Sequence, residues 1–261
     1  MSLPRISIVT VTYNASRFFQ SAIDSVKAQN YGNLEYIVID GGSNDGTVDI
    51  IKQNLDVINQ WKSERDQGIY DAMNKGIRLA TGDIIGLLNA DDYYADGTLN
   101  YLAAEFLKCR DNIDIYHGDV GVIWPGKIKV IKPDTDLLAK RMSLNHPTCF
   151  VRREVYSEKE FNIAFSIAGD YEFLLWCYLN NKKFHYIEKV LTYYRPVGKS
   201  SLPSFGNADA FHIWKRYFGW KRAVWLFGKD SFYKLFSVPV KMLLYRFFGE
   251  ARYLEILASK Q

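Results

Sequence analysis

Residues 34–47 read LEYIVIDGGSNDGT, an apolar, β-branched run that ends in a carboxylate and a glycine-rich turn. The run predicts a strand over Leu34–Asp40 that is buried on both faces. The turn supplies glycines that allow positive φ beside acceptor side chains. Because it matches neither GxGxxG nor GxxxxGK[ST], a dinucleotide fold and a P-loop are disfavoured. A plain strand-to-helix loop is the alternative interpretation of this turn.

The segment before this stretch predicts a strand followed by a helix. ISIVTVTY (Ile6–Tyr13) is short and β-branched. Apolar residues then recur every four positions between Phe18 and Val26, which is typical of an amphipathic helix. We expect Asn14 or Ser16 to cap that helix.

The segments after residue 47 continue the alternation. A helical stretch starts at Val48, YDAMNKGIRLA (residues 70–80) predicts a helix, and IIGLL (residues 84–88) predicts an apolar strand. This order predicts an α/β fold with a mostly parallel sheet flanked by helices. Open sheets of this kind bind ligands at the carboxyl ends of their strands. Three such ends carry polar clusters, at residues 12–14, 40–43 and 89–92.

Composition excludes several classes of protein. The chain has 261 residues, of which 48% are hydrophobic, enough for a large core, so we do not expect disorder. Cys109, Cys149 and Cys177 form no close pair, so neither a disulfide framework nor a thiolate zinc site is indicated. The apolar start is too short for a signal peptide, and no apolar run reaches the ~18 residues of a spanning helix. A cytoplasmic protein is expected.

Charge and aromatic residues gather at the C-terminus. The net charge is +4, and residues 205–261 hold ten Lys and Arg against four Asp and Glu, with fifteen aromatic residues. We therefore expect a catalytic domain over residues 1–200 and a helical extension over residues 201–261. Residues 237–257 predict a basic amphipathic helix that contacts an anionic membrane peripherally. Packing on the core or on a second copy remains the alternative, and nucleic acid is disfavoured because no binding module accompanies these residues.

Two adjacent carboxylates end the predicted strand in GLLNADDYYADGT (residues 86–98). Asp91 and Asp92 repel one another unless a cation or water lies between them. Mg²⁺ is usually bound by one or two carboxylates together with the phosphates of a substrate. The pair therefore suggests a divalent cation and a diphosphate, and hence a nucleotide-activated donor. A solvated turn is the alternative.

Six segments, in order, resemble the inverting glycosyltransferases of the GT-A fold, family 2. They are ISIVTVTYNA, IVIDGGSNDGT, ERDQGIYDAMNKGIRLATGD, IGLLNADDYY, HPTCFVRREVY and AGDYEFLLWCYLNN, and they cover residues 5 to about 195. The resemblance implies a donor-binding half over about residues 1–110 and an acceptor half over about 111–200. It also implies a UDP- or dTDP-sugar donor, Mn²⁺ or Mg²⁺, and a saccharide or lipid-linked saccharide acceptor.

The resemblance also assigns roles to particular residues. Those implied to bind the nucleotide-sugar are Thr12, Tyr13, Asn14, Asp40, Asp66, Gly68, Asn74, Lys75, Asn89, Asp91, His146 and Arg195. Arg195 and Lys199 lie where related chains have a loop over the donor. Asp91 and Asp92 match the acidic motif that binds ribose and metal. Where many relatives have Asp-x-Asp-Asp, this chain begins the motif with Asn89, which keeps an acceptor oxygen without the charge.

Asp170, in IAGDYEFLL, is the candidate base that accepts the proton of the acceptor hydroxyl. Its motif resembles the family's Glu-Asp pair, with Gly169 in the position of the Glu. The alternative is that Asp170 only caps a helix over Tyr171–Leu179. Two other classes stay open: a non-catalytic nucleotide-sugar binding protein, and a nucleotidyltransferase, although TYNASRFF lacks the basic glycine-rich loop typical of the latter.

Overall fold

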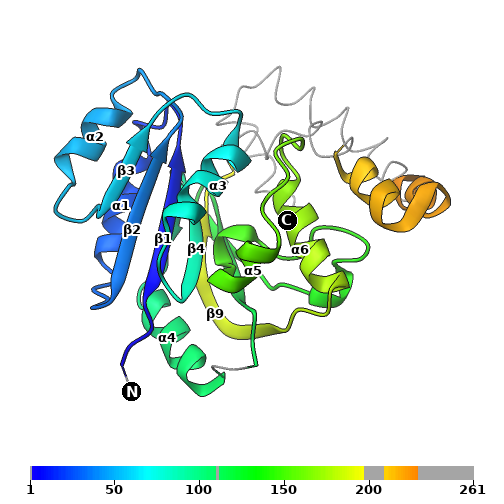
Figure 1. Cartoon of the computed structure of the whole chain (residues 1–261). Helices are drawn as coiled ribbons and strands as arrows, with labels where there is room; N and C mark the ends of the chain where they lie inside the picture. Colours follow the sequence, from blue (N-terminus) through cyan, green and yellow to red (C-terminus); the bar gives the residue numbers. More distant parts are fainter. Residues whose placement is uncertain (1, 110–111, 197–208, 229–261) are drawn as a thin grey trace. The chain divides into compact units, whose positions relative to one another are not determined.

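The computed structural model describes residues 2–109, 112–196 and 209–228 (Figure 1). These residues fall into two compact units. The first comprises residues 2–109, 112–121 and 130–194, and the second comprises residues 122–129, 195–196 and 209–228. The candidate site residues belong to the first unit, with the exception of Arg195.

Strands and helices alternate through the first part of the chain, as the sequence predicts. The elements are β1 (Ile6–Thr12), α1 (Phe19–Lys27), β2 (Leu34–Asp40), α2 (Thr47–Gln53), β3 (Gln60–Ser63), α3 (Ile69–Leu79) and β4 (Ile84–Asn89). Their strands lie in the order β3-β2-β1-β4, all parallel. Thr12 pairs with Asp40, and Val11 pairs with Asn89. The three predicted polar clusters therefore lie at one edge of the sheet.

The second part of the chain extends the sheet with antiparallel strands, which the sequence patterns did not resolve. Its elements are β5 (Tyr93–Tyr94), α4 (Thr98–Cys109), β6 (Ile115–Trp124), β7 (Lys127–Ile131), η1 (Thr135–Leu137), η2 (His146–Thr148), β8 (Phe150–Arg152), α5 (Arg153–Glu158), α6 (Gly169–Leu179) and β9 (Phe184–Tyr194). The strand order continues β4-β8-β6-β9-β5, with β7 paired to β6. β8 runs antiparallel to β4 and to β6, and β5 runs antiparallel to β9.

The main core lies between one face of the sheet and helices α1 and α4. Phe19 and Ile23 of α1 and Phe106 of α4 are buried there against apolar residues of the strands. Helix α3 covers the other face. A Cβ on Gly76 would lie 2.2 Å from Val9, so only glycine permits this close approach of helix and sheet.

The start of α1 differs from the prediction. Its N-cap residue is Phe18, and no side chain caps it. Asn14 has φ of +48° and its Oδ1 accepts a hydrogen bond of 3.0 Å from the Asn44 N–H. The Ser16 N–H donates to Asp45 Oδ2 over 3.0 Å. Asn14 and Ser16 thus join the loop after β1 to the loop after β2, and this use replaces the predicted capping.

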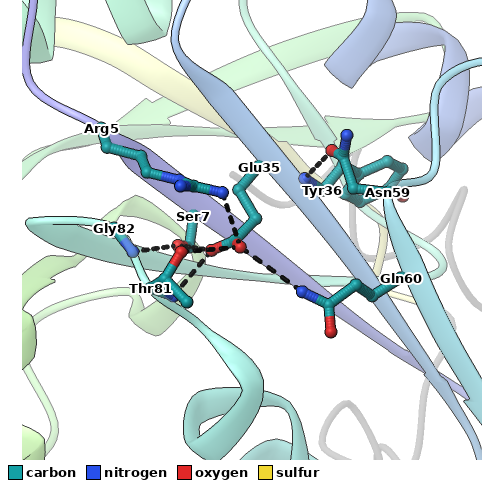
Figure 2. Close-up of polar contacts among 8 residues, drawn as sticks. All are labelled: Arg5, Ser7, Glu35, Tyr36, Asn59, Gln60, Thr81 and Gly82. Atoms are coloured by element: carbon teal, nitrogen blue, oxygen red, sulfur yellow. Dashed lines mark hydrogen bonds and ion pairs between the residues drawn. The ribbon is translucent and has the colours of Figure 1, made fainter.

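A buried carboxylate joins three segments at the opposite edge of the sheet (Figure 2). Glu35 is 2% exposed and accepts hydrogen bonds from the Ser7 hydroxyl at 2.5 Å and from the Thr81 N–H at 2.7 Å. The Arg5 guanidinium lies 3.0 Å from its other oxygen. Burial raises the pKa of Glu35, but these hydrogen bonds and Arg5 outweigh it and hold the pKa below its usual value.

The second unit contains helical residues 209–228. Gly219 has φ of +78°, and the ring centroid of Phe211 lies 5.4 Å from that of Phe227. A straight helix would separate these residues by about 24 Å, so the chain reverses its direction near Gly219. In the part of the chain that the structure describes, no helix is long and apolar enough to cross a bilayer. The predicted amphipathic segment 237–257 lies outside the described residues.

Candidate active site

The ends of β1 and β2 bring three of the predicted donor-binding residues together. Thr12 is buried, and its Oγ1 has no hydrogen-bond partner. Tyr13 is 65% exposed. A Cβ on Gly41 would lie 2.4 Å from Asp66 Oδ2 and 3.4 Å from the Tyr13 ring, so both side chains pack against the bare backbone of the glycine. An exposed aromatic ring and a carboxylate therefore lie around one glycine, whose N–H donates to the Thr12 carbonyl.

Asp40 organises the turn that follows it. It is fully buried and its carboxylate accepts hydrogen bonds from the N–H groups of Gly42 and Ser43, at 3.1 and 3.0 Å. The hydroxyl groups of Ser43 and Ser63 also donate to it, at 2.5 and 2.6 Å. Buried carboxylates need such donors, so Asp40 holds the glycine-rich turn in place beside β1. Its contact with a nucleoside stays a prediction.

Helix α3 begins in the segment predicted to line the nucleotide. Gly68 precedes the helix with φ of +117°, and its N–H donates to Asp66 Oδ1 over 2.9 Å. Lys75 lies 3.1 Å from Glu64 and 3.0 Å from Asp71. Its ammonium group therefore holds the loop after β3 against α3.

Asn74 is occupied within the protein. It is 3% exposed, its Nδ2 donates to the Phe161 carbonyl over 2.9 Å, and its Oδ1 accepts from the Phe161 N–H over 3.0 Å. Both ends of the amide therefore bind the backbone of a segment 87 residues away. The structure gives Asn74 a supporting position, and its contact with the donor stays a prediction.

The acidic motif follows β4. Asp92 is fully buried and Asp91 is partly buried. Asn89 Nδ2 donates to Asp92 Oδ2 over 3.1 Å, and the Asp92 N–H donates to the Asn89 carbonyl over 3.1 Å. An Asp at position 89 could not make the first of these bonds without a proton, which accounts for the departure from Asp-x-Asp-Asp.

The donor atoms of this motif suit a hard divalent cation. Asp91 and Asp92 are carboxylates, and the buried Oδ1 of Asn89 has no hydrogen-bond partner. Within the described ranges, no group of three closely spaced His, Cys, Asp or Glu residues includes Asp91 or Asp92. The protein thus offers two carboxylates at this point, and the remaining ligands of a cation would have to come from substrate and water.

His146 and Asp170 line one small cavity. The cavity has a volume of about 10 Å³, about one water molecule, and is otherwise lined mainly by apolar side chains. His146 is 9% exposed and its Nε2 has no hydrogen-bond partner. Burial lowers the pKa of His146, and the charge of Asp170 partly opposes this. The short helix η2, which begins at His146, also contacts β4, the strand that leads to Asp91.

Asp170 lies inside the first turn of α6. The helix begins at Gly169 with Ala168 as its N-cap residue, so the alternative role of Asp170 as the N-cap is wrong. Asp170 Oδ1 accepts hydrogen bonds from the Tyr171 N–H at 2.8 Å and from the Tyr70 hydroxyl at 3.1 Å. The N-terminal end of a helix suits a negatively charged side chain, and the two hydrogen bonds orient this carboxylate.

Tyr70 is a site residue that the sequence analysis missed. It is 4% exposed, and its single hydroxyl proton is shared between Asp170 Oδ1 and the Ile167 carbonyl. A Cβ on Gly169 would lie 2.8 Å from the Tyr70 ring. The ring therefore occupies the space that a Glu side chain would need, which explains why glycine stands at position 169. A tyrosine inside the polar segment DQGIYDAMNK was the available signal.

Arg195 belongs to the second unit and is partly buried. Lys199 lies outside the described residues. The predicted closure of this segment over the donor therefore stays a prediction.

Residues 7–161 match the model of the family described as Glycosyl transferase family 2. The chain belongs to this family. The PGL/p-HBAD biosynthesis glycosyltransferase of Mycobacterium tuberculosis is 32% identical over 218 residues, which are 79% of this chain and 80% of that one. This protein is therefore a glycosyltransferase, and the class of enzyme expected from the sequence is confirmed.

Two solved glycosyltransferases confirm the expected GT-A fold. Residues 1–349 of S. aureus TarS, in complex with UDP-GlcNAc, match with a TM-score of 0.68 at 18% identity, over 81% of this chain and 65% of that one. The mannosyltransferase PcManGT from Pyrobaculum calidifontis, in complex with GDP-Man and Mn²⁺, matches with a TM-score of 0.63 at 16% identity, over 100% of this chain and 80% of that one.

Proposed function

We propose that this glycosyltransferase moves a sugar from a UDP- or dTDP-sugar to a hydroxyl group of a saccharide or lipid-linked saccharide, with inversion at the anomeric carbon. The observation that carries the proposal is the position of His146, which shares a cavity with Asp170 and lies on an element in contact with β4. The element that carries His146 thus contacts the strand that leads to the acidic pair, and His146 itself lines a cavity with the predicted base. Metal-dependent transfer to a hydroxyl group needs both.

The donor nucleotide would bind where β1 and β2 end. The exposed ring of Tyr13 offers a face for a base, and the buried Oγ1 of Thr12 and the carboxylate of Asp66 offer hydrogen-bonding groups beside it. The UDP-GlcNAc bound to TarS and the GDP-Man bound to PcManGT support a nucleotide-sugar as donor.

Asp91 and Asp92 would hold a divalent cation, Mn²⁺ or Mg²⁺, with Asn89 Oδ1 as a further oxygen nearby. The Mn²⁺ in the PcManGT complex supports this choice. When bound, such a cation supplies positive charge that stabilises a leaving diphosphate.

Asp170 would take the proton from the attacking hydroxyl group. Its two hydrogen bonds, from Tyr171 and Tyr70, fix the carboxylate and leave its other oxygen for the acceptor. A base so placed contributes a factor of typically ~10²–10⁴. Because Asp170 acts as a base, a single in-line displacement needs no covalent intermediate.

The acceptor and the location of the enzyme complete the proposal. The name of the M. tuberculosis relative, which refers to PGL/p-HBAD biosynthesis, supports a biosynthetic role for the sugar transfer. Peripheral contact with the inner face of the membrane through residues 237–257, a cytoplasmic location and self-association remain parts of the proposal.

A thermal-shift screen of nucleoside diphosphates and their sugars, with and without Mn²⁺, identifies the donor without an acceptor. We expect a Mn²⁺-dependent rise in melting temperature with UDP or dTDP. Asp170→Asn should retain this rise and abolish sugar transfer, whereas Asp49→Asn, a first-turn Asp of α2, should retain both. Calorimetry that shows no metal-dependent binding of any nucleoside diphosphate would refute the proposal.

A further inference from the structure

Helix α4 and strand β9 bring together three side chains that can ligate a metal, outside the candidate active site. Glu105 and Cys109 lie one turn apart on α4, and His185 is the second residue of β9. A carboxylate oxygen, the thiol sulfur and a ring nitrogen of these residues lie within 4.8 Å of one another. His185 Nε2 is 3.0 Å from Glu105 Oε2. Among the described residues, no other such group of three occurs.

A fourth polar group borders the cluster. Tyr116, on β6, is fully buried, and its hydroxyl has no hydrogen-bond partner. The Tyr116 ring lies edge-on to the ring of His185, with the centroids 5.6 Å apart. Since buried hydroxyl groups are nearly always paired, an unpaired one beside three ligating groups indicates a missing neighbour.

The charges around Glu105 leave the needed atoms available. Lys108 Nζ binds Glu105 Oε1 at 2.7 Å, whereas His185 faces Oε2. The carboxylate therefore presents one oxygen toward the imidazole and thiol groups.

We propose that Glu105, Cys109 and His185 form a binding site for a borderline divalent cation, with zinc preferred. Zinc binds carboxylate oxygen, imidazole nitrogen and thiolate sulfur at about 2.0–2.3 Å, so ligand atoms around a tetrahedral ion lie roughly 3.3–3.7 Å apart. In the cluster one pair of ligand atoms is 3.0 Å apart and all lie within 4.8 Å of one another, so small side-chain rotations reach this spacing. Three protein ligands leave a fourth position for water. Binding releases the proton of the Cys109 thiol.

The proposed site is chemically and spatially distinct from the acidic motif. Asp91 and Asp92 offer hard oxygen ligands that suit Mg²⁺ or Mn²⁺, whereas thiolate and imidazole groups favour zinc. In Figure 1, α4 lies near the amino-terminal end of β1, away from the strand ends that carry the donor-binding residues. A metal ion here would join the end of α4 to the start of β9. Its expected effect is therefore greater stability of the fold.

Zinc titration of the full-length protein tests the proposal. After chelator treatment and dialysis, and with Mg²⁺ in excess, the wild-type chain should bind one zinc ion in competition with a chromophoric chelator. Cys109→Ser and His185→Ala should each weaken this binding at least 100-fold. The double variant Asp91→Asn/Asp92→Asn should retain it, because the acidic motif is not involved. Zinc should raise the melting temperature of the wild type and of this double variant only.

Cobalt(II) gives a readout that does not depend on stability. We expect a thiolate-to-cobalt charge-transfer band in the wild type and in Cys177→Ser, whose thiol is buried elsewhere, and no band in Cys109→Ser. Circular dichroism of the metal-free variants checks that each is folded. A wild-type chain without stoichiometric zinc, or equal zinc affinity in wild type and Cys109→Ser, overturns the proposal.

Discussion

The hydroxyl of Tyr70 lies 3.1 Å from Oδ1 of Asp170, across 100 residues of sequence. Burial and then the charge of Asp170 raise the pKa of Tyr70 well above its usual value, so the phenol stays protonated and remains a donor. The contact joins α3, which follows the donor-lining segment, to the first turn of α6. One hydrogen bond thus connects the two halves of the candidate site.

Tyr70→Phe should lower the rate of transfer without weakening donor binding. A hydrogen bond to a charged group contributes about 1.5–3 kcal/mol, so kcat should fall roughly 10- to 100-fold while KM for the donor stays unchanged. Steady-state kinetics with the donor found by thermal shift measure both. Tyr36→Phe is the control, because it removes a buried bond of 3.1 Å to Thr10 instead. A loss confined to KM would show that Tyr70 supports donor binding only.

Gly169→Ala should destabilise the protein although alanine is the better helix former. Its Cβ would lie 2.8 Å from the ring of Tyr70, and overpacking of this kind costs about 1–3 kcal/mol. Urea unfolding measures the loss, which should shrink when Tyr70 is also changed to Leu. Gly32→Ala is the control, because nothing lies within 4 Å of the added Cβ. If Gly169→Ala stabilised the chain, the close packing on Tyr70 would be refuted.

Asn89→Asp should tighten metal binding and weaken the metal-free fold. The change replaces the amide that donates to Asp92 over 3.1 Å with a carboxylate, so two like charges meet unless a cation lies between them. We expect a lower melting temperature without metal and a higher Mn²⁺ affinity in the presence of UDP, measured by calorimetry. Asn100→Asp adds the same charge at an exposed position of α4 and should change neither. Unchanged Mn²⁺ affinity would argue against a cation at this motif.

Glu35→Gln should remove a pH-dependent part of the stability. The pKa of Glu35 in the folded chain lies below its usual value of 4.5, so the folded state favours the carboxylate. Its contribution is complete above pH 4.5 and is lost as the pH falls through the lowered pKa. At pH 7 we expect a loss of about 1–3 kcal/mol in urea unfolding.

The difference between wild type and Glu35→Gln should narrow in acid. Glu188→Gln is the matched control, since its pair with Lys132 is exposed. The same difference at pH 7 and at pH 3.5 would mean that the ionised carboxylate is not what stabilises this edge of the sheet.

Local sequence patterns determined the first half of the fold. Apolar runs and four-residue spacing predict a strand over Leu34–Asp40 and a helix over residues 70–80. The structure has β2 over Leu34–Asp40, and α3 begins and ends within one residue of the predicted helix. The parallel pairing of β1 with β2 also followed, because strand-helix-strand order permits little else. The polar ends of β1, β2 and β4 lie at one edge as a geometric consequence of that pairing.

Only the tertiary structure decided which distant residues meet. The contact of Tyr70 with Asp170, the packing of Tyr70 on Gly169, and the cluster of Glu105, Cys109 and His185 join segments about 80 to 100 residues apart. No periodicity records such contacts, because side-chain spacing reports only the neighbours on one helix or strand. The spacing of the cysteines in the sequence suggested no metal site at Cys109, because the other two groups of the cluster, Glu105 and His185, come from another turn of α4 and from β9. Packing of separate elements around a shared core brings these groups together, and with them the chemistry that each can perform.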